Sequence, residues 1–474
     1  MTTQDYHRVP PGKSCGSSLT AVSAAATLSP MAILRMVNSI RPYDWGSATE
    51  IPRLTGIENP NGRPMAELWM GAHPGAPSGV RLDGDSEPLP VYLSRDVEGV
   101  LGPEVARRFG GRLPFLLKIL AADRPLSIQA HPDLEQARAG FAREEEAGIP
   151  RDAFERSYRD DNHKPELIRA LTRFSALRGF RPFAAIAEEF SGPEFSGRGP
   201  AGRTSAAAGG DGMAALAAAV SELRASPGEP SLRRFFSALM STEAATLAEA
   251  AMLRARNART RAGGARGGGA RPHERSRYEW VERLGDEYGA DRGVAAPLYL
   301  NCLELAPGEA MFLPAGTLHA YLEGSGIEIM ANSDNVLRGG LTRKHVDVPE
   351  LIRTLVFAPD DPEIVRADPD APPGQWYRYA TPASEFALEE TRVDGTAERP
   401  RPAATPEVVL ALEGAVRLED EAGDGVELSR GESAFVTADT GDYTLRGTAR
   451  VFVATVPLEA DSPSGAETAP GAGR

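Results

Sequence analysis

Three polar residues alternate along one apolar segment of the chain and could line a site for a metal ion or a substrate. The segment Pro125–Pro132 reads PLSIQAHP, in which Ser127, Gln129 and His131 are spaced by two residues. On an extended strand, residues at this spacing share one face. A polar face of this kind loses hydration on burial, so it either faces solvent or lines a site with partners. From this segment alone, a solvent-facing edge strand and a functional strand are both acceptable interpretations.

An acid and a base share one face of a second segment, His163–Leu167, which reads HKPEL. The proline disfavours a helical Lys164, so the segment is expected to be extended and to open a strand. Lys164 and Glu166 then form a solvated ion pair, or Glu166 is the anionic ligand of a divalent ion. Zinc accepts histidine nitrogen and carboxylate oxygen, and amide oxygen is a weaker donor. The candidate ligands are Gln129, His131, Glu166 and His319.

The fourth candidate, His319, follows a tight turn between expected strands. We expect strands at Leu298–Leu305 and Met311–Leu313, and the sequence PAG closes the second one. From Gly308 onward the residues fit G-x5-P-x-G-x2-H-x3, which resembles the second half of the metal motif of cupin barrels. This resemblance implies that the turn aims the imidazole into a barrel mouth. One departure is Glu323, which stands where the cupin pattern usually has asparagine.

The segment Gly308–Gly324 is partly repeated near the C-terminus. Aligned without gaps on Gly431–Gly447, it gives seven identities in seventeen positions. This similarity predicts two barrels derived from one ancestral unit. In the second copy Asp442 replaces His319, and the proline and glycine of the turn are lost. We therefore expect no metal chemistry in the second copy.

The length and charge of the chain limit the classes of function. Its 474 residues suggest roughly three domains, and contents of 41% hydrophobic and 25% charged residues are typical of a soluble globular protein. The net charge of -14 argues against sequence-independent binding of nucleic acid. Cys15 and Cys302 are far apart, so we expect no disulfide framework, which fits a reducing cytoplasm. No stretch reaches transmembrane length.

Two parts of the chain are expected to lie outside the β-structure. Residues 1–36 lack a clear pattern and are interpreted as a disordered extension or an over-long start rather than a signal peptide. Residues 184–292 contain alanine-rich runs with helical spacing at Met213–Ala225 and Ser231–Arg256, and they predict a helical insert.

The helical insert is interrupted by two glycine-rich stretches. Ser196–Gly212 and Ala262–Arg271 are interpreted as disordered loops. The second lies in a basic run, Arg254–Arg277. We interpret this run as a solvated loop rather than a nucleic-acid site.

Seven motifs, in order along the chain, resemble those of one enzyme family. RPYDWGS, AELWMGAHP, LPFLLKIL, LSIQAHPD, HKPEL, PAGTLHAYLEG and IEIMANSDNVLRGGLT are similar to motifs of the type I phosphomannose isomerases. Taken alone, Trp45 and Trp69 are interpreted as core residues and His73 as a structural turn histidine. The resemblance covers roughly residues 37–355, with a weaker C-terminal part to about residue 457.

The resemblance implies a mainly β fold of two cupin-like double-stranded β-helix (jelly-roll) domains with an additional α-helical domain. The implied catalytic barrel comprises residues 37–183 and 293–357, interrupted by the helical insert. A degenerate second barrel at 358–460 and a disordered tail at 461–474 would complete the chain.

By position, the resemblance also assigns the site residues. One zinc ion per chain would be held by the four candidate ligands named above. The family's active-site arginine falls on Arg338, and Arg343 replaces a family proline just before Lys344. The implied pocket residues are Ser127, Lys164, Tyr321, Glu328 and, near the entrance, Trp45.

The implied reaction interconverts mannose 6-phosphate and fructose 6-phosphate by proton transfer through a cis-enediol. Glu328 and Lys164 are both candidates for the base, and zinc with Arg338 would stabilise the oxyanion. Arg338 with Lys118 or Lys344 are candidates for the phosphate contacts. The product would supply GDP-mannose synthesis, or mannose would feed glycolysis. We expect a cytoplasmic monomer that acts on a small sugar phosphate, without nucleic-acid or membrane partners.

Three other functions fit a barrel of this kind, because such barrels host many chemistries. A cupin dioxygenase would use a redox metal and typically a histidine-rich motif, whereas the ligands here include Gln129 and Glu166. A non-enzymatic sugar-binding cupin need not keep every ligand together with Arg338. An isomerase of a different sugar phosphate would keep the same motif spacing.

Overall fold

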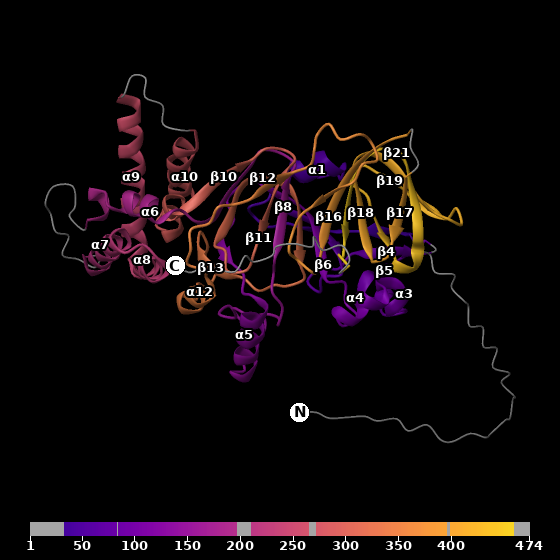
Figure 1. Ribbon diagram of the computed structural model, residues 1–474, viewed down its shortest axis with the longest axis horizontal. Coiled ribbons are helices and arrows are strands. Elements are labelled where there is room, and N and C mark those ends of the chain that lie inside the picture. The colour runs from indigo at the N-terminus through magenta and orange to yellow at the C-terminus, as the bar shows by residue number, and fades with distance from the viewer. Residues whose placement is uncertain (1–32, 83, 197–209, 265–271, 396–398, 459–474) are drawn as a thin grey trace, which may run out of the picture. The chain divides into compact units, whose positions relative to one another are not determined.

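The computed structural model describes residues 33–82, 84–196, 210–264, 272–395 and 399–458. Within these residues the strands form two sheets, of eleven and ten strands, and every pairing between strands is antiparallel (Figure 1). The prediction of a mainly β protein with an additional helical part is confirmed. The predicted tail at 461–474 and most of the predicted N-terminal extension lie outside the described residues.

The eleven-stranded sheet has the order β14-β11-β8-β12-β6-β3-β2, with the other strands pairing off this path. Its strands are β2 (Ser39–Arg41), β3 (Glu67–Gly71), β6 (Phe115–Ala122), β7 (Ile128–Ala130), β8 (Glu166–Ala170), β9 (Phe174–Phe180), β10 (Leu300–Leu305), β11 (Glu309–Leu313), β12 (His319–Ala331), β13 (Leu337–Gly340) and β14 (Ile364–Arg366).

The ten-stranded sheet combines the C-terminal strands with three strands from the beginning of the described chain. Its strands are β1 (Ile33–Val37), β4 (Gly79–Leu82), β5 (Asp85–Pro88), β15 (Tyr377–Tyr379), β16 (Ala387–Asp394), β17 (Arg399–Ala403), β18 (Glu407–Asp420), β19 (Gly425–Ser429), β20 (Ser433–Val436) and β21 (Gly441–Thr455).

The helices connect and cover these sheets. They are α1 (Glu50–Thr55), α2 (Leu89–Leu93), α3 (Val97–Leu101), α4 (Pro103–Arg108), α5 (Leu134–Glu146), α6 (Phe183–Phe190), η1 (Pro193–Phe195), α7 (Gly210–Ala225), α8 (Glu229–Ser241), α9 (Ala244–Gly264), α10 (Pro272–Tyr288), η2 (Arg292–Ala295), α11 (Ala296–Tyr299), α12 (Val348–Thr354) and η3 (Ala438–Thr440). In the described parts of the chain, no helix is long and apolar enough to span a membrane.

Strand β12 is the centre of the eleven-stranded sheet. Its first residues pair with β7 and β9, and its second half pairs with β6 and β8. A register shift between Tyr321 and Glu323, followed by Gly324 at a φ of 122°, separates the two halves. One strand therefore brings both His319 and Glu328 to neighbouring strands.

The two sheets share a hydrophobic core. Along β12, Ile327 and Ile329 alternate with Glu328, so the two isoleucines face this core while the glutamate faces the opposite side. The same core contains Leu410 and Phe435 from the ten-stranded sheet, all fully buried. The C-terminal strands are therefore packed directly against the strands that carry the candidate site.

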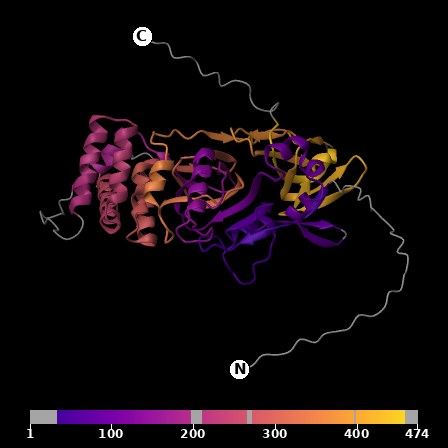
Figure 2. The ribbon, with the colours of Figure 1, turned by 90° about the horizontal axis from the view of Figure 1, so that it is seen from below.

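A bundle of helices covers a different part of the eleven-stranded sheet. Figures 1 and 2 show α7 to α10 gathered at the side away from β16, β18 and β21. Their apolar side chains, including Leu216, Phe235 and Leu284, join Leu177 of β9 and Ala320 of β12 in one core. This bundle lies in the region predicted to be a helical insert.

The structure corrects two predictions within the helical region. The predicted run Ser231–Arg256 is two helices, α8 and α9, because Thr242 takes an extended conformation with ψ of 144°. The predicted solvated loop Arg254–Arg277 is wrong at both ends, since Arg254 and Arg277 lie in α9 and α10 and form ion pairs with the buried Glu189. Within the two predicted loops, residues 210–212 belong to α7 and residues 262–264 belong to α9. Residues 197–209 and 265–271 lie outside the described residues.

Three predicted strand boundaries also differ from the structure. Residues 1–36 were predicted to be a disordered extension, but strand β1 already begins at Ile33 and pairs with β20 of the ten-stranded sheet. The predicted strand at 298–305 begins only at Leu300, because residues 296–299 form the short helix α11 with Pro297 in its first turn. Strand β7 covers only Ile128–Ala130, so His131 lies just beyond its end.

The repeated segments take the same local structure. Gly308 and Gly431 have φ values of 97° and 82°, and in each turn the next residue is a glutamate whose carboxylate accepts the backbone N–H three residues earlier. Gly324 and Gly447, which the alignment also matches, have φ values of 122° and 138°. The segments differ at the turn before the histidine, where Gly316 has a φ of 74° and the second copy forms η3 instead.

The shared core predicts a large effect of Phe435→Ala on stability. Removing this fully buried ring leaves a cavity between the sheets and should lower the free energy of unfolding by about 3–5 kcal/mol. The control Phe154→Ala, at a ring that is 67% exposed, should change it by less than about 0.5 kcal/mol. Urea unfolding followed by circular dichroism measures both, and equal losses would contradict a shared core.

Candidate metal centre and catalytic pocket

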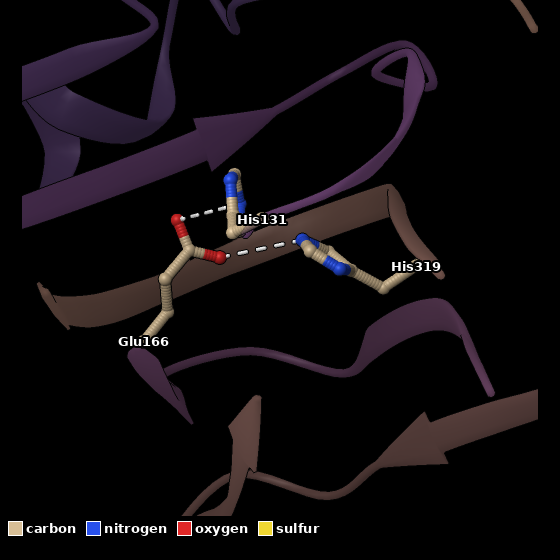
Figure 3. A group of neighbouring side chains, drawn as sticks. All are labelled: His131, Glu166 and His319. Carbon is tan, nitrogen blue, oxygen red and sulfur yellow. Dashed lines mark ion pairs between the residues drawn. The ribbon is translucent and has the colours of Figure 1, made fainter. Parts of the chain in front are cut away.

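Two histidines and a glutamate from separate segments meet inside the eleven-stranded sheet. His319 opens β12, Glu166 opens β8 and His131 follows β7. Each side chain is at most 2% exposed, and their nearest ligand atoms lie within 4.8 Å of one another. Figure 3 shows the carboxylate of Glu166 between the two imidazole rings. The structure thus brings together three of the four residues predicted to bind a metal.

The orientation of both imidazoles indicates a metal site. His131 Nδ1 lies 2.7 Å from the carbonyl oxygen of Asn335, and His319 Nδ1 lies 2.9 Å from that of Thr317. Each Nδ1 therefore carries the proton and donates it, which leaves Nε2 with a lone pair. The two Nε2 atoms face the Glu166 oxygens at 3.5 and 3.3 Å. Acceptors that face acceptors in a buried site repel each other, and a bound cation removes this repulsion.

The surrounding charges keep these groups in the forms that bind metals. Burial would raise the pKa of Glu166, but Lys164 and His131 outweigh it and hold that pKa well below its ordinary value. Burial, assisted by the positive charge of Lys164, lowers the pKa of His131 to about 4. The Glu166 carboxylate and a neutral His131 imidazole are therefore present at neutral pH, as metal binding requires.

The fourth predicted ligand, Gln129, lies in register with two functional candidates. Its backbone pairs with His319 of β12 on one side and with Arg338 of β13 on the other. Directly paired residues project their side chains to the same face of a sheet. Gln129 is half-buried and lines the cavity beside the metal cluster, and its role as a fourth ligand stays a prediction.

A cavity of about 170 Å³ opens beside the cluster. It contains six of the residues predicted for the site, and the others in its wall were not predicted. The lining residues are Tyr43, Glu67, Trp69, His73, Leu116, Lys118, Leu120, Leu126, Gln129, Lys164, Glu166, Tyr321, Glu328, Met330, Asp334 and Val336.

One wall of the cavity is a row of paired residues on β3, β6 and β12. Trp69 pairs with Lys118, which in turn pairs with Glu328. Lys118 Nζ lies 2.8 Å from Glu328 Oε2 and 3.5 Å from Glu67 Oε1, and Trp69 Nε1 donates to Glu67 at 2.7 Å. Burial would lower the pKa of Lys118, but Glu328 and Glu67 raise it, so the ammonium is retained.

In the same row, the surroundings of Glu328 favour its neutral, protonated form, whereas those of Lys118 favour its charged form. Burial raises the pKa of Glu328, and Glu166 and Glu67 add to this effect, while Lys118 opposes it. Nearby, the hydroxyl of Tyr321 is buried without a hydrogen-bond partner in the described structure, and burial raises its pKa well above 10. The cavity therefore combines a carboxyl group whose pKa is raised with a phenol that stays protonated.

The remaining predicted residues lie outside the described lining of the cavity. Ser127 is half-buried immediately before β7, and Trp45 stacks on the lining residue Tyr43 with ring centroids 5.7 Å apart. Arg338 lies opposite Gln129, and its Nε is buried without a hydrogen-bond partner in the described chain. Lys344 is exposed beyond β13.

Arg338 and Lys344 lie near a third cation, Arg159, which the sequence analysis did not identify. Burial lowers the pKa of Arg338, and Arg159 lowers it further. Partial burial lowers the pKa of Lys344, with contributions from Arg338 and Arg159. Among the described residues, no carboxylate forms an ion pair with any of the three. This uncompensated positive charge is suited to a phosphate group.

A buried asparagine positions the metal cluster and this cation group together. Asn335 is 0% exposed, and its backbone oxygen accepts a hydrogen bond from His131 Nδ1. Its side-chain amide donates to the backbone oxygens of Asp160 and Asn162 and accepts the N–H of Arg159 at 2.7 Å. The loops that contain Arg159 and Asn335 are therefore fixed against each other beside His131.

Sequence reasoning missed several residues of the cavity, above all Glu67, Trp69 and Asp334. Trp69 and His73 were interpreted as a core residue and a turn histidine. His73 does accept the N–H of Gly75, as in a turn, but both side chains also line the cavity. The spacing of Glu67 and Trp69 by two residues on one strand was the available signal, since it puts both on the face that carries Lys118.

The fold and the site together define a β-sheet enzyme with a buried metal-binding centre at a polar pocket. A family profile for the catalytic domain of type I phosphomannose isomerase matches residues 33–183. The chain is 37% identical to the mannose-6-phosphate isomerase of Salmonella typhimurium, over 88% of this chain and 98% of that protein. The Arabidopsis thaliana mannose-6-phosphate isomerase 1 is 32% identical over 86% of this chain and 89% of its own.

A solved structure of a zinc-bound mannose 6-phosphate isomerase has the same fold. It aligns with a TM-score of 0.76 and 34% identity, covering 90% of this chain and all of the other. The chain therefore belongs to the type I mannose-6-phosphate isomerase family, and the resemblance drawn from the motifs is confirmed.

The lone-pair geometry predicts that His319→Ala impairs metal binding. The substitution removes one of the buried Nε2 donors, so zinc affinity should fall by more than the roughly 10–100-fold typical of losing an outer-shell partner. Competition with a chromogenic chelator measures this change. The control His345→Ala, a half-buried histidine outside the cavity, should keep wild-type affinity. Equal affinities of the two variants would contradict the site.

Proposed function

We propose that the protein is a zinc-dependent aldose-ketose isomerase that interconverts D-mannose 6-phosphate and D-fructose 6-phosphate. The observation that carries this proposal is the His131–Glu166–His319 cluster beside a pocket with a buried, partnered Glu328. Family membership supports the substrate. In this proposal, one zinc ion per chain is held by the cluster with Gln129.

The bound zinc would supply positive charge that orients and polarises substrate oxygens. The chain's own residues have the remaining roles. Glu166 and the two histidines provide one negative charge for a divalent ion, so the site keeps a positive field toward the sugar. Tyr321 contributes a protonated hydroxyl that is free to donate to a substrate oxygen. Trp69, Leu120 and Met330 give the cavity wall apolar surface, which would displace water from a bound sugar.

Isomerisation needs one group that takes a proton from one carbon and returns it to the neighbouring carbon. Both candidates line the cavity, but Lys164 donates to Glu166 of the cluster, whereas burial raises the pKa of Glu328 above its ordinary value. A base is most effective when its pKa is near the operating pH. We therefore favour Glu328 as the group that moves the proton through a cis-enediol, with Lys164 holding Glu166.

The phosphate would be bound by the uncompensated cations at the end of β13. Arg338 offers a bidentate guanidinium, and Lys344 and Arg159 add charge. Lys118 is less suited to this role because its ammonium is already paired with Glu328 and Glu67. In this arrangement Ser127 and Trp45 contact the sugar from the pocket margin.

The same proposal extends to domains and cellular role. Residues 37–183 and 293–357 would form the catalytic cupin-like barrel, with 184–292 a helical insert and 358–460 a degenerate second barrel, while β4 and β5 extend the ten-stranded sheet and β14 the eleven-stranded sheet. The matching turns at Gly308 and Gly431 support a duplicated unit. The enzyme would act as a cytoplasmic monomer that supplies mannose 6-phosphate for GDP-mannose synthesis or feeds mannose into glycolysis.

Purified protein should convert mannose 6-phosphate to fructose 6-phosphate in a metal-dependent manner. Chelation should abolish turnover and zinc should restore it, because the cluster binds the ion that orients the sugar. A coupled spectrophotometric assay measures this activity, and mass spectrometry of product formed in deuterium oxide tests for proton exchange at the reacting carbons. Folded, zinc-loaded protein without turnover would refute the proposed reaction.

Two substitutions separate the candidate bases. Glu328→Gln should lower kcat by roughly 10²–10⁴-fold while zinc content stays at the wild-type level, because Glu328 is not a ligand. Lys164→Gln should weaken zinc binding as well, since Lys164 contacts Glu166. The control Glu323→Gln, on the exposed surface of the same strand, should retain activity. Wild-type kcat in the Glu328 variant would exclude it as the base.

A further inference from the structure

A second cavity lies between the two sheets and carries positive charge. Its volume is about 210 Å³, and in the described structure it shares no lining residue with the catalytic pocket. Its walls include two carboxylates, Asp368 and Glu390, against four guanidinium groups. These belong to Arg169, Arg366, Arg392 and Arg450. This surplus of positive charge is local, since the whole chain has a net charge of -14.

The floor of the cavity is built from buried groups. Arg169 lies on β8, three residues after Glu166, so it projects from the face opposite the metal centre. It is 1% exposed and donates to both oxygens of Glu390, each at 3.0 Å. Arg450 Nε also donates to Glu390, at 2.8 Å. Glu390 is thus shared by two guanidinium groups, and Arg450 also forms an ion pair with the exposed Glu413 at 3.5 Å.

Two of the arginines converge over a glycine. The position that a Cβ atom would take at Gly308 lies 3.8 Å from Arg366 Nε and 3.9 Å from Arg169 Nη2. The space above Gly308 is therefore open between two guanidinium groups. Arg366 comes from β14 at the sheet edge, is exposed, and has no hydrogen-bond or ion-pair partner within the described chain. Guanidinium groups in this arrangement match the geometry of tetrahedral oxyanions.

We propose that this cavity binds a phosphate group, free or carried by a small metabolite, over Gly308 between Arg366 and Arg169. Arg450 from the ten-stranded sheet contributes to the field from the opposite wall, and the four guanidinium groups still exceed the carboxylates of Asp368, Glu390 and the Arg450 partner Glu413 by one charge. The ligand would bridge the two sheets and stabilise their packing. This site is independent of the isomerase activity, so either proposal can fail without the other.

Thermal unfolding in phosphate-free buffer, with added inorganic phosphate or glycerol 3-phosphate, tests this site. Saturating ligand should raise the Tm of the wild type by roughly 2–4 °C. Arg366→Gln should remove at least half of this shift. The matched control Arg138→Gln, another exposed arginine without a partner in the described structure, should keep the full shift. A response to inorganic phosphate alone identifies the free ion, and a response to both identifies the phosphate group of a metabolite.

The catalytic pocket is a second place where phosphate can bind, so Arg338→Gln is included. If the proposal is correct, this variant retains the shift while Arg366→Gln loses it, and both variants have the wild-type Tm without phosphate to within about 1 °C. The proposal is overturned if phosphate gives no shift in the wild type, if Arg366→Gln and Arg138→Gln respond equally, or if only Arg338→Gln loses the shift.

Discussion

The repulsion between lone pairs at the metal centre is the constraint on which the rest of the structure depends. Two Nε2 atoms and a carboxylate of buried residues face one another within 4.8 Å. Such an arrangement is unfavourable by itself and is retained only where neighbouring groups fix each side chain. The carbonyls of Asn335 and Thr317 fix the imidazoles, and Lys164 fixes the carboxylate. The site is thus held ready for a cation.

The backbone provides this rigidity through antiparallel pairing and a shared core. Strand β12 pairs with four neighbours and places His319 and Glu328 on two successive parts of the sheet. Its other face packs through Ile327 and Ile329 into the core formed with the ten-stranded sheet. The C-terminal strands have Asp442 where the first copy has His319, and they pack behind the strands that carry the site. The helical bundle supports the opposite half of the sheet in the same way.

Strand β8 connects the two charged regions of the protein. Its Glu166 is held on one face by Lys164, and its Arg169 is held on the other face by Glu390. Both side chains are almost completely buried, so each depends on its opposite charge to offset the loss of hydration. A single strand therefore links the packing of the metal centre with the packing between the sheets.

The sequence by itself determined the residue types of the metal centre and the family. Spacing by two along PLSIQAHP, the turn before His319 and the order of seven motifs depend on local geometry, which a sequence contains. Only the tertiary structure decided that Glu67 and Trp69 meet Lys118, that Asn335 joins the loop of Arg159, and that Arg254 and Arg277 are buried against Glu189. These contacts join segments far apart in the chain. Strand register and helix packing set them, and no local pattern specifies which distant segments become neighbours.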